Sequence, residues 1–455
     1  MAPETITEFA SAKPFTPTAI ENMKKKSWTV MVYLAGDNNL DSAGVTDLNE
    51  MKKIGSTNAL NIVAQFDRRA ASRQTHRYFL RKGGNLESDV VDNLGETNTG
   101  DPSVLTDFIV WSVQNYPAAC YMLVIWNHGG GWDDTDVYRL ARRVAGANVT
   151  RRGAPIHPAL DDGSNSISMR RIRIIGGRKF HRALFRSSIE KAVRVRAIAY
   201  DDNAQDFLDN IELKRVVVAA KKKIGRNLDI LGMDACLMSM AEIGYQLRDS
   251  ADFTVGSEQT EPGDGWPYNT LLGDLAKNPN MKPGDLSKSI VKRYLASYGT
   301  NDGVTQSACD LSQATALLRS VDQLATALRN GLTDPVARAG ISQSRLQVQS
   351  YDVPDYVDLR DLCELLQSSC AGDKSIVKAA KAVNQAVGKY VVASGAKGDG
   401  VANSHGVSIH FPADPSQPLS PLYGNLDFAK DGGWRKFLVE WLKTLQRRKP
   451  LRRRG

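Results

Sequence analysis

The chain has 455 residues, 42% of them apolar, so it is long enough for two or three domains and a large buried core. Its formal net charge of +9 first suggests an anionic partner, such as nucleic acid or a membrane surface. No stretch approaches the ~20 consecutive apolar residues of a membrane span, so we expect a soluble chain without a membrane partner.

The cysteines and the N-terminal residues bear on the cellular compartment. The five cysteines are an odd number and include no Cys-x-x-Cys pair, so the sequence indicates neither a disulfide framework nor a zinc site. Residues 1–26 contain prolines and small polar residues but no apolar core of signal-peptide length, and we expect a flexible arm there. A reducing, cytoplasmic location is the simplest inference.

The first buried strand is expected at residues 27–36, followed by a helix that runs to about Ile54. Four polar residues stand between them: Asp37, Asn38, Asn39 and Asp41. Their oxygen atoms could gather a hard cation such as Ca²⁺, or they could cap the helix, which is the commoner role. Strands at residues 60–66 and 74–80 and a helix at residues 101–114 then continue an alternation typical of a doubly wound α/β layer.

A candidate for proton transfer follows the next strand. Residues 121–126 form a continuous apolar run, and His128 with three consecutive glycines comes directly after it. Such glycines mark a turn where the backbone approaches a bound group closely, at the edge where open α/β sheets place their ligands. His128 is therefore either a general acid and base at this edge or, as with most isolated histidines, a structural residue.

The alternation breaks between residues 137 and 199, where fifteen basic residues stand against three acidic ones. The basic balance of the whole chain belongs to this segment. So long a connection inside a compact domain is unusual unless it is functional or mobile. Three interpretations stay open: a solvated loop without a role, a binding arm for an anionic partner, and a cleavable linker.

A candidate nucleophile lies at the end of a second buried strand, expected over residues 228–234. The apolar residues after Cys236 have helical spacing, which predicts that Cys236 lies at a strand-to-helix junction. Free backbone N–H groups and the helix dipole would favour a thiolate there. A lone cysteine is otherwise a small buried hydrophobe, but the pairing with His128 favours a thiol–imidazole dyad.

Together these motifs resemble the clostripain family of cysteine peptidases. The paired signature consists of Asn-His-Gly-Gly-Gly-Trp at residues 127–132 and Met-Asp-Ala-Cys-Leu-Met at residues 233–238. The resemblance extends from Trp28 over most of the chain and includes four further stretches: residues 30–40, 61–68, 258–268 and 406–412. Each motif alone is modest, but their number and order make the match specific.

The resemblance implies a caspase-like α/β/α sandwich with a mostly parallel central sheet and cleavage after Arg or Lys. His128 and Cys236 would be the catalytic dyad, and N–H groups of Gly129 and Cys236 would hold the oxyanion. Asp264 would form the base of the S1 pocket together with Asp234, where a carboxylate pairs with a guanidinium. The alternatives are that Asp234 caps the following helix and that Asp264 only holds a turn.

The resemblance also bears on the basic segment and on a cofactor. Family members are activated by internal cleavage between the two catalytic residues, which favours the linker interpretation for an insertion at residues 137–197. Arg142 and Arg143 are the expected first cleavage sites, because processing lies soon after the histidine. The sequence requires no cofactor, although the resemblance suggests dependence on Ca²⁺.

The catalytic domain is expected over residues 27–299, and a smaller, mainly helical subdomain over residues 300–455. This subdomain returns one strand at residues 406–411 and ends in a basic tail. We interpret His405 and His410 as structural, with His405 as the fallback candidate for the catalytic imidazole.

The function predicted from the sequence is a cysteine endopeptidase that acts on proteins or peptides with a basic P1 residue. The alternative is a non-catalytic basic adaptor that binds an anionic partner such as nucleic acid. An adaptor predicts steeply salt-dependent binding without turnover.

Overall fold

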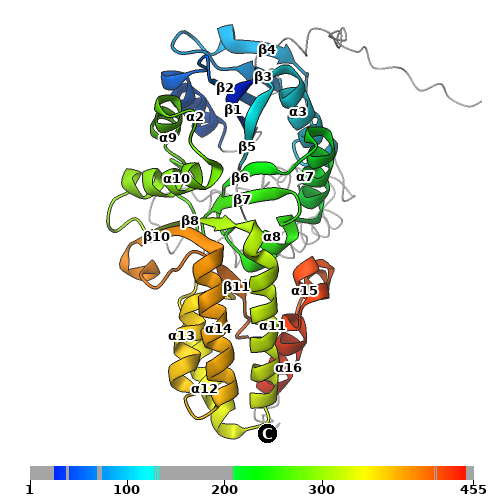
Figure 1. Ribbon diagram of the computed structural model, residues 1–455, viewed down its shortest axis with the longest axis vertical. Coiled ribbons are helices and arrows are strands. Elements are labelled where there is room, and N and C mark those ends of the chain that lie inside the picture. The colour runs from blue at the N-terminus through cyan, green and yellow to red at the C-terminus, as the bar shows by residue number, and fades with distance from the viewer. Residues whose placement is uncertain are drawn as a thin grey trace, which may run out of the picture.

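The computed structural model describes residues 25–36, 40–68, 74–127, 129, 131–132, 208, 210–414, 416 and 418–446. Its centre is a nine-stranded sheet in the order β10-β8-β7-β6-β5-β1-β2-β3-β4 (Figure 1). The five central strands are parallel: β2 (Leu60–Arg68), β1 (Lys26–Gly36), β5 (Ala118–Trp126), β6 (Leu228–Asp234) and β7 (Ala251–Gly256). The outer strands are antiparallel: β3 (His76–Phe79), β4 (Val90–Asn93), β8 (Val304–Asp310) and β10 (Val391–Lys397).

Helices cover both faces of the sheet, because the central strands are apolar on both sides. Alternate residues of β1 belong to different cores: Met31 and Tyr33 pack on one side, and Val30 and Val32 on the other. The first core includes residues of α3 (Pro102–Asn115), α7 (Asn210–Ile224) and α8 (Ala241–Leu247). The second includes residues of α2 (Asp41–Ile54), α9 (Tyr268–Lys277) and α10 (Pro283–Ser297). The predicted α/β/α sandwich is confirmed.

The C-terminal part is mainly helical, with α11 (Ala314–Gly331), α12 (Pro335–Gln347), α13 (Leu359–Ser369), α14 (Lys374–Tyr390), the short α15 (Asp427–Asp431) and α16 (Trp434–Gln446). Aspartates fix where three of these helices begin: the side chains of Asp334, Asp358 and Asp373 accept hydrogen bonds from backbone N–H groups of the first turn. The sheet does not stop at the boundary expected near residue 300, since β8 and β10 both belong to it. Among the described residues, no helix is long and apolar enough to cross a membrane.

A second, two-stranded sheet joins the helical part to the central sheet. It pairs β9 (Tyr356–Asp358) with β11 (Ser408–His410) in antiparallel register. Ser408 also forms a parallel bridge with Met240, just before α8. The strand expected at residues 406–411 is therefore present, and it lies against the segment that follows Cys236.

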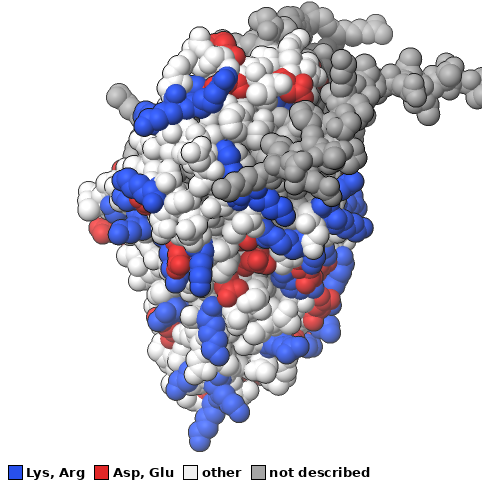
Figure 2. Space-filling view, turned by 45° about the horizontal axis from the view of Figure 1, so that its top comes forward, with Lys and Arg blue, Asp and Glu red and all other residues white. Residues whose placement is uncertain are grey.

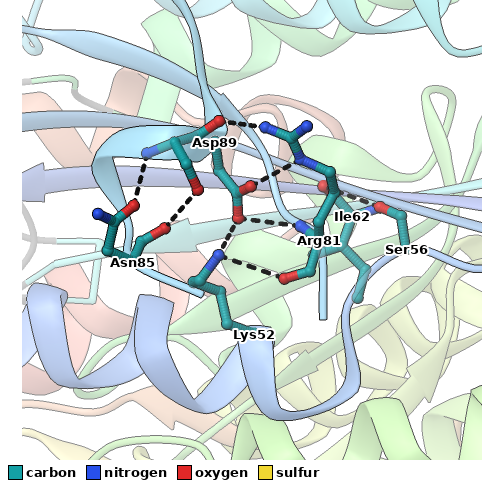
Figure 3. A network of polar contacts seen from close by, with 7 residues as sticks. Lys52, Ser56, Ile62, Arg81, Asn85 and Asp89 are labelled. Atoms are coloured by element: carbon teal, nitrogen blue, oxygen red, sulfur yellow. Dashed lines mark hydrogen bonds and ion pairs between the residues drawn. The ribbon is translucent and has the colours of Figure 1, made fainter. Parts of the chain in front are cut away.

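A buried carboxylate anchors the outer strands of the central sheet (Figure 3). Asp89 is 1% exposed, and its side chain bonds Lys52 of α2 and accepts from the backbone N–H of Arg81 at 3.0 Å. Burial alone would raise the pKa of Asp89, but the hydrogen bonds from Lys52 and Arg81 outweigh it and the pKa lies below its ordinary value. This network ties α2 to the turn before β4, far along the sheet from Cys236.

Candidate active site

The two strands that carry the paired signature end at the same edge of the sheet. Trp126 of β5 pairs with Asp234 of β6, so residue 128 and Cys236 each follow two residues beyond this pair. His128 itself lies outside the described residues, but the residues on either side of it are described. Asn127 donates from its side-chain amide to the Ala35 carbonyl of β1 at 2.8 Å, which fixes where β5 ends.

Gly129 lies against the backbone of Cys236. A β-carbon on Gly129 would come within 2.0 Å of the Cys236 carbonyl oxygen and within 2.7 Å of its nitrogen. Only glycine fits so close an approach. The two residues whose N–H groups are predicted to hold an oxyanion are therefore in backbone contact.

The Cys236 thiol is 1% exposed and contacts the backbone N–H and carbonyl of one residue in a neighbouring loop. The backbone N–H of Glu261 donates to Sγ at 3.2 Å, and Sγ lies 3.9 Å from the carbonyl oxygen of the same residue. This loop follows β7, the strand next to β6 in the sheet. The thiol thus belongs to an interior site bounded by the ends of three adjacent strands.

The prediction that a helix begins at Cys236 is wrong. The helix α8 starts only at Ala241, and Leu237 has a φ of 65°, in the left-handed region that L residues rarely adopt. Leu237 N–H donates to the Gln259 carbonyl at 3.2 Å and Ser239 N–H to the Ser257 carbonyl at 2.9 Å. These bonds to the loop after β7 replace the intrahelical bonds, and burial of the whole segment on all sides explains its helix-like apolar spacing.

The two carboxylates predicted for the S1 pocket have opposite environments. Asp234 is fully buried and accepts from the Tyr268 hydroxyl at 2.9 Å and from the Trp266 N–H at 3.4 Å. Asp264 is exposed, at the tip of a turn closed by the Gly265 N–H and the Pro262 carbonyl at 3.0 Å. Gly265 has a φ of 57°, and its carbonyl accepts from a buried tyrosine hydroxyl at 2.7 Å. The turn that presents Asp264 is therefore anchored from beneath.

Sequence inspection missed how β11 supports the Cys236 segment. Ser239 Oγ donates to the Gly406 carbonyl at 2.8 Å, and the Ser408 N–H donates to the Ser239 carbonyl at 2.9 Å. Gly406 N–H in turn donates to the buried Glu258 carboxylate at 2.8 Å, at the start of the loop that carries Glu261. No local signal identifies these partners, because they are about 170 residues apart in sequence.

His405 and His410 lie close to this support, and their pKa values are shifted in opposite directions. His405 contacts Asp358 through its backbone N–H at 2.6 Å and through Nδ1 at 3.1 Å, and the hydrogen bond to Asp358 raises the pKa of His405. Burial lowers the pKa of His410 to about 3, so its ring stays neutral. The carboxylate of Asp358 also caps α13, which gives His405 a structural partner.

Trp132, in the turn after His128, packs into a buried cluster with His410, Tyr423 and Glu242. The Trp132 ring lies edge-on to the rings of His410 and Tyr423, with centroids 4.7 Å and 4.6 Å away. The Glu242 carboxyl accepts from the Tyr423 hydroxyl and from the His410 N–H, both at 2.9 Å. Burial raises the pKa of Glu242 to about 7. The C-terminal part thus contacts both of the loops that carry the paired signature.

The residues proposed for a cation and for self-cleavage are mostly beyond what the structure describes. Asp37 and Asn38 lie outside the described residues, as do Arg142, Arg143 and the whole insertion at residues 137–197. Asp41 is described, and both its carboxylate oxygens accept from Arg68 at 2.9 Å. Within the described ranges, no group of three or more His, Cys, Asp or Glu side chains is arranged to hold a metal ion.

Comparison with known proteins extends the match beyond the paired motifs. The profile of the clostripain family matches residues 32–148 and 186–441, and the gap between these two ranges lies within the basic insertion. Clostripain of Hathewaya histolytica is 25% identical over an alignment of 406 positions that covers 76% of this chain and 66% of that protein. The chain thus spans just under two thirds of the length of this relative.

Two solved structures have a similar fold. One is an inactive zymogen C11 protease from Parabacteroides distasonis, with a TM-score of 0.58 at 19% identity. The other is a secreted C11 cysteine protease from Bacteroides thetaiotaomicron in complex with an irreversible peptide inhibitor, with a TM-score of 0.58 at 20% identity. Each similarity covers 90% of this chain and 99% of the other. With the family profile matched over most of its length, the chain belongs to the clostripain family of cysteine peptidases.

Proposed function

We propose that this protein is a cysteine endopeptidase that cleaves after Arg or Lys, with Cys236 as the nucleophile and His128 as the general acid and base. The backbone contact between Gly129 and Cys236, at the shared edge of β5 and β6, is the observation that carries the proposal. This contact supports the proposal that the loops after β5 and β6 meet at the point where an acyl group would react.

The proposed reaction has two steps. The Cys236 thiolate attacks the carbonyl carbon of the basic residue, and the oxyanion accepts hydrogen bonds from the N–H groups of Gly129 and Cys236. His128 protonates the leaving amine, which frees the C-terminal product. His128 then takes a proton from water, and the resulting hydroxide attacks the thioester and releases the N-terminal product.

The S1 site is proposed to use Asp264 for direct contact with the guanidinium or ammonium group. Its exposure at an anchored turn supports this role, since a substrate can reach it. The buried Asp234 is proposed to contribute indirectly, through its hydrogen bonds with Tyr268 and the Trp266 N–H. One hydrogen bond to a charged group contributes about 1.5–3 kcal/mol, which corresponds to roughly 10- to 100-fold preference for a basic P1 residue.

The protein is also proposed to mature by cutting its own Arg-rich insertion, first at Arg142 or Arg143. A peptidase with this specificity would meet its preferred residue many times between its two catalytic residues. A cytoplasmic location and a dependence on Ca²⁺ remain part of the proposal. Protein or peptide chains are the proposed partners.

A nucleic-acid adaptor has less support on the described surface. On the face drawn in Figure 2, Lys and Arg side chains are interspersed with Asp and Glu and form no single basic field. A nucleic-acid footprint requires basic residues gathered on one face or along one groove.

One assay tests the function. The purified protein is incubated with a fluorogenic Arg peptide, alone, after treatment with a thiol-alkylating agent, and with a chelator. We expect hydrolysis that alkylation abolishes, and the chelator arm reports on Ca²⁺. Absence of turnover in every arm, together with salt-dependent binding of nucleic acid, would instead favour the adaptor.

A further inference from the structure

The source of thiolate stabilisation at Cys236 is not a helix. A free cysteine has a pKa near 8.5, so only a few per cent is ionised near neutral pH and a nucleophilic cysteine needs a stabilising donor. The nearest helix, α8, begins five residues after Cys236 and has only seven residues. Because a helix dipole acts within the first turn, it contributes little at this distance.

One donor that contacts the sulfur belongs to the Glu261 backbone. Its N–H points at Sγ from 3.2 Å, and both residues are at most 1% exposed. A hydrogen bond between a buried N–H and an anion is stronger than one between neutral partners, because water does not compete. The 3.9 Å contact with the Glu261 carbonyl gives the protonated thiol an acceptor on the same residue.

A single hydroxyl on the next strand fixes the loop that carries this N–H. Thr305 of β8 is 1% exposed, and its Oγ1 accepts from the N–H groups of Glu258 and Gln259, both at 3.0 Å. These bonds use both lone pairs, so the Thr305 hydroxyl proton donates to Ser257 Oγ at 2.9 Å. Ser257 Oγ accepts from the Gln259 N–H at 3.1 Å and closes the network.

The loop is also attached directly to the nucleophile's own segment. The Gln259 carbonyl accepts from the Leu237 N–H at 3.2 Å, and the Ser257 carbonyl accepts from the Ser239 N–H at 2.9 Å. On the other side of the loop, the Gln306 side chain donates to the Glu261 carboxylate at 3.2 Å. A shift of this loop therefore moves the Glu261 N–H relative to Sγ.

We propose that the Glu261 N–H stabilises the Cys236 thiolate and that Thr305 is the positioning residue that holds this donor in place. The inference rests on the proposed function for the use of that thiolate in catalysis. Thr305 contacts neither substrate nor sulfur in this scheme. It acts only through the loop of residues 257–261.

The test compares Thr305→Val with Thr305→Ser and follows alkylation of Cys236 by iodoacetamide as a function of pH. Alkylation is read by mass from the peptide that contains Cys236, with Cys236→Ala as the blank. Valine has the shape of threonine but leaves the Glu258 N–H without its acceptor and the Gln259 N–H with only Ser257 Oγ. We expect the half-maximal pH for alkylation to rise by about one unit, a tenfold loss of thiolate near neutral pH.

The same variants are assayed with the Arg peptide. For Thr305→Val, kcat at neutral pH should fall about tenfold while KM changes little, because the S1 carboxylates are untouched. Thr305→Ser keeps the hydroxyl and should behave as wild type in both assays. Thr254→Val is the matched control: Thr254 is a buried threonine of β7 whose hydroxyl makes no hydrogen bond to the loop of residues 257–261, and it should leave the alkylation profile unchanged.

An unchanged alkylation profile in folded Thr305→Val would overturn the inference, and so would a Thr305→Ser variant as impaired as Thr305→Val. If Thr305→Val does not fold, Ser257→Ala removes one member of the network, and we expect a smaller shift in the same direction; no shift would again refute the role. Alkylation does not require turnover. A wild-type protein that alkylates as expected but cleaves no peptide would refute the proposed function and leave the donor assignment intact.

Discussion

Gly129 and Cys236 are so close that a single β-carbon on Gly129 would lie 2.0 Å from the Cys236 carbonyl oxygen. The two residues are 107 positions apart in sequence and follow β5 and β6, which are neighbours in the sheet. The parallel register that places Trp126 beside Asp234 makes this contact possible. The geometry of the candidate site therefore depends first on how closely the Gly129 and Cys236 backbones approach each other, and only then on side chains.

Replacing Gly129 by alanine should lower the peptidase activity strongly and the stability of the fold only slightly. The added methyl group forces the turn away from Cys236 by an ångström or more, and a displacement of that size costs about 100-fold in rate. We expect kcat/KM for an Arg peptide to fall about 100-fold, measured beside thermal unfolding. Gly388→Ala in α14 is the control, since its β-carbon would meet no atom within 4 Å. Full activity in Gly129→Ala would contradict the proposed oxyanion site.

The two carboxylates proposed for the S1 site should respond differently when each is replaced by its amide. Asp264→Asn removes a charge at an exposed turn, so we expect a 10- to 100-fold loss of Arg cleavage, unchanged stability and unchanged alkylation of Cys236. Steady-state kinetics with Arg and neutral P1 peptides measure the preference. Asp399→Asn, at another exposed site, is the matched control. An undiminished preference for Arg would show that Asp264 does not read the P1 charge.

Asp234→Asn should lower stability as well as activity. Asp234 is fully buried and accepts from Tyr268 and Trp266, and its amide would present N–H groups to one of these donors. We expect a loss of about 1–3 kcal/mol in the free energy of unfolding, measured by urea denaturation. Tyr268→Phe removes only the hydroxyl donor and should cost less. Equal stability of Asp234→Asn and wild type would contradict this structural role.

Glu242 should make the protein less stable as the pH rises from about 4.5 to about 7. Burial raises the pKa of Glu242 from 4.5 to about 7, so over this interval the folded state binds more protons than the unfolded state. The sign of the linkage then gives a falling free energy of unfolding, by about 3 kcal/mol in total, and no further change above pH 7.

Urea unfolding at pH 5 and pH 8 measures this effect, with Glu242→Gln as the comparison. Glutamine keeps an oxygen for Tyr423 and His410 but cannot ionise, so it should be more stable than wild type at pH 8 and nearly equal at pH 5. His405 also favours its protonated form in the fold, but it contributes equally to both proteins. Glu440→Gln, on the surface of α16, should show no such difference. Parallel pH profiles for wild type and Glu242→Gln would refute the assignment.

The sequence predicted the parallel core of the sheet because β5 is a continuous apolar run followed by Asn-His-Gly-Gly-Gly, and β6 is a short apolar run, broken by Asp229 and Gly232, that leads into Asp-Ala-Cys. It did not predict that β8 joins the sheet, since Thr305, Gln306 and Ser307 are three consecutive polar residues that interrupt any alternation, and the Thr305 and Gln306 side chains hold the loop after β7. The start of α8 was misplaced because local periodicity cannot register the bridge from Met240 to Ser408. In both cases, the structure differs from the prediction because of contacts between segments that are distant in sequence.

Self-cleavage should depend on Cys236 and on the arginines soon after His128. Purified wild-type protein is expected to run as two fragments under denaturing conditions, and Cys236→Ala as a single full-length band. Mass analysis of the fragments locates the cut, which we place after Arg142 or Arg143, and Arg142→Gln with Arg143→Gln should move or slow it. Arg151→Gln with Arg152→Gln is the matched pair from the same basic segment and should leave the first cut in place. Identical single bands for wild type and Cys236→Ala would refute maturation by self-cleavage, while two fragments from Cys236→Ala would assign the cut to another peptidase.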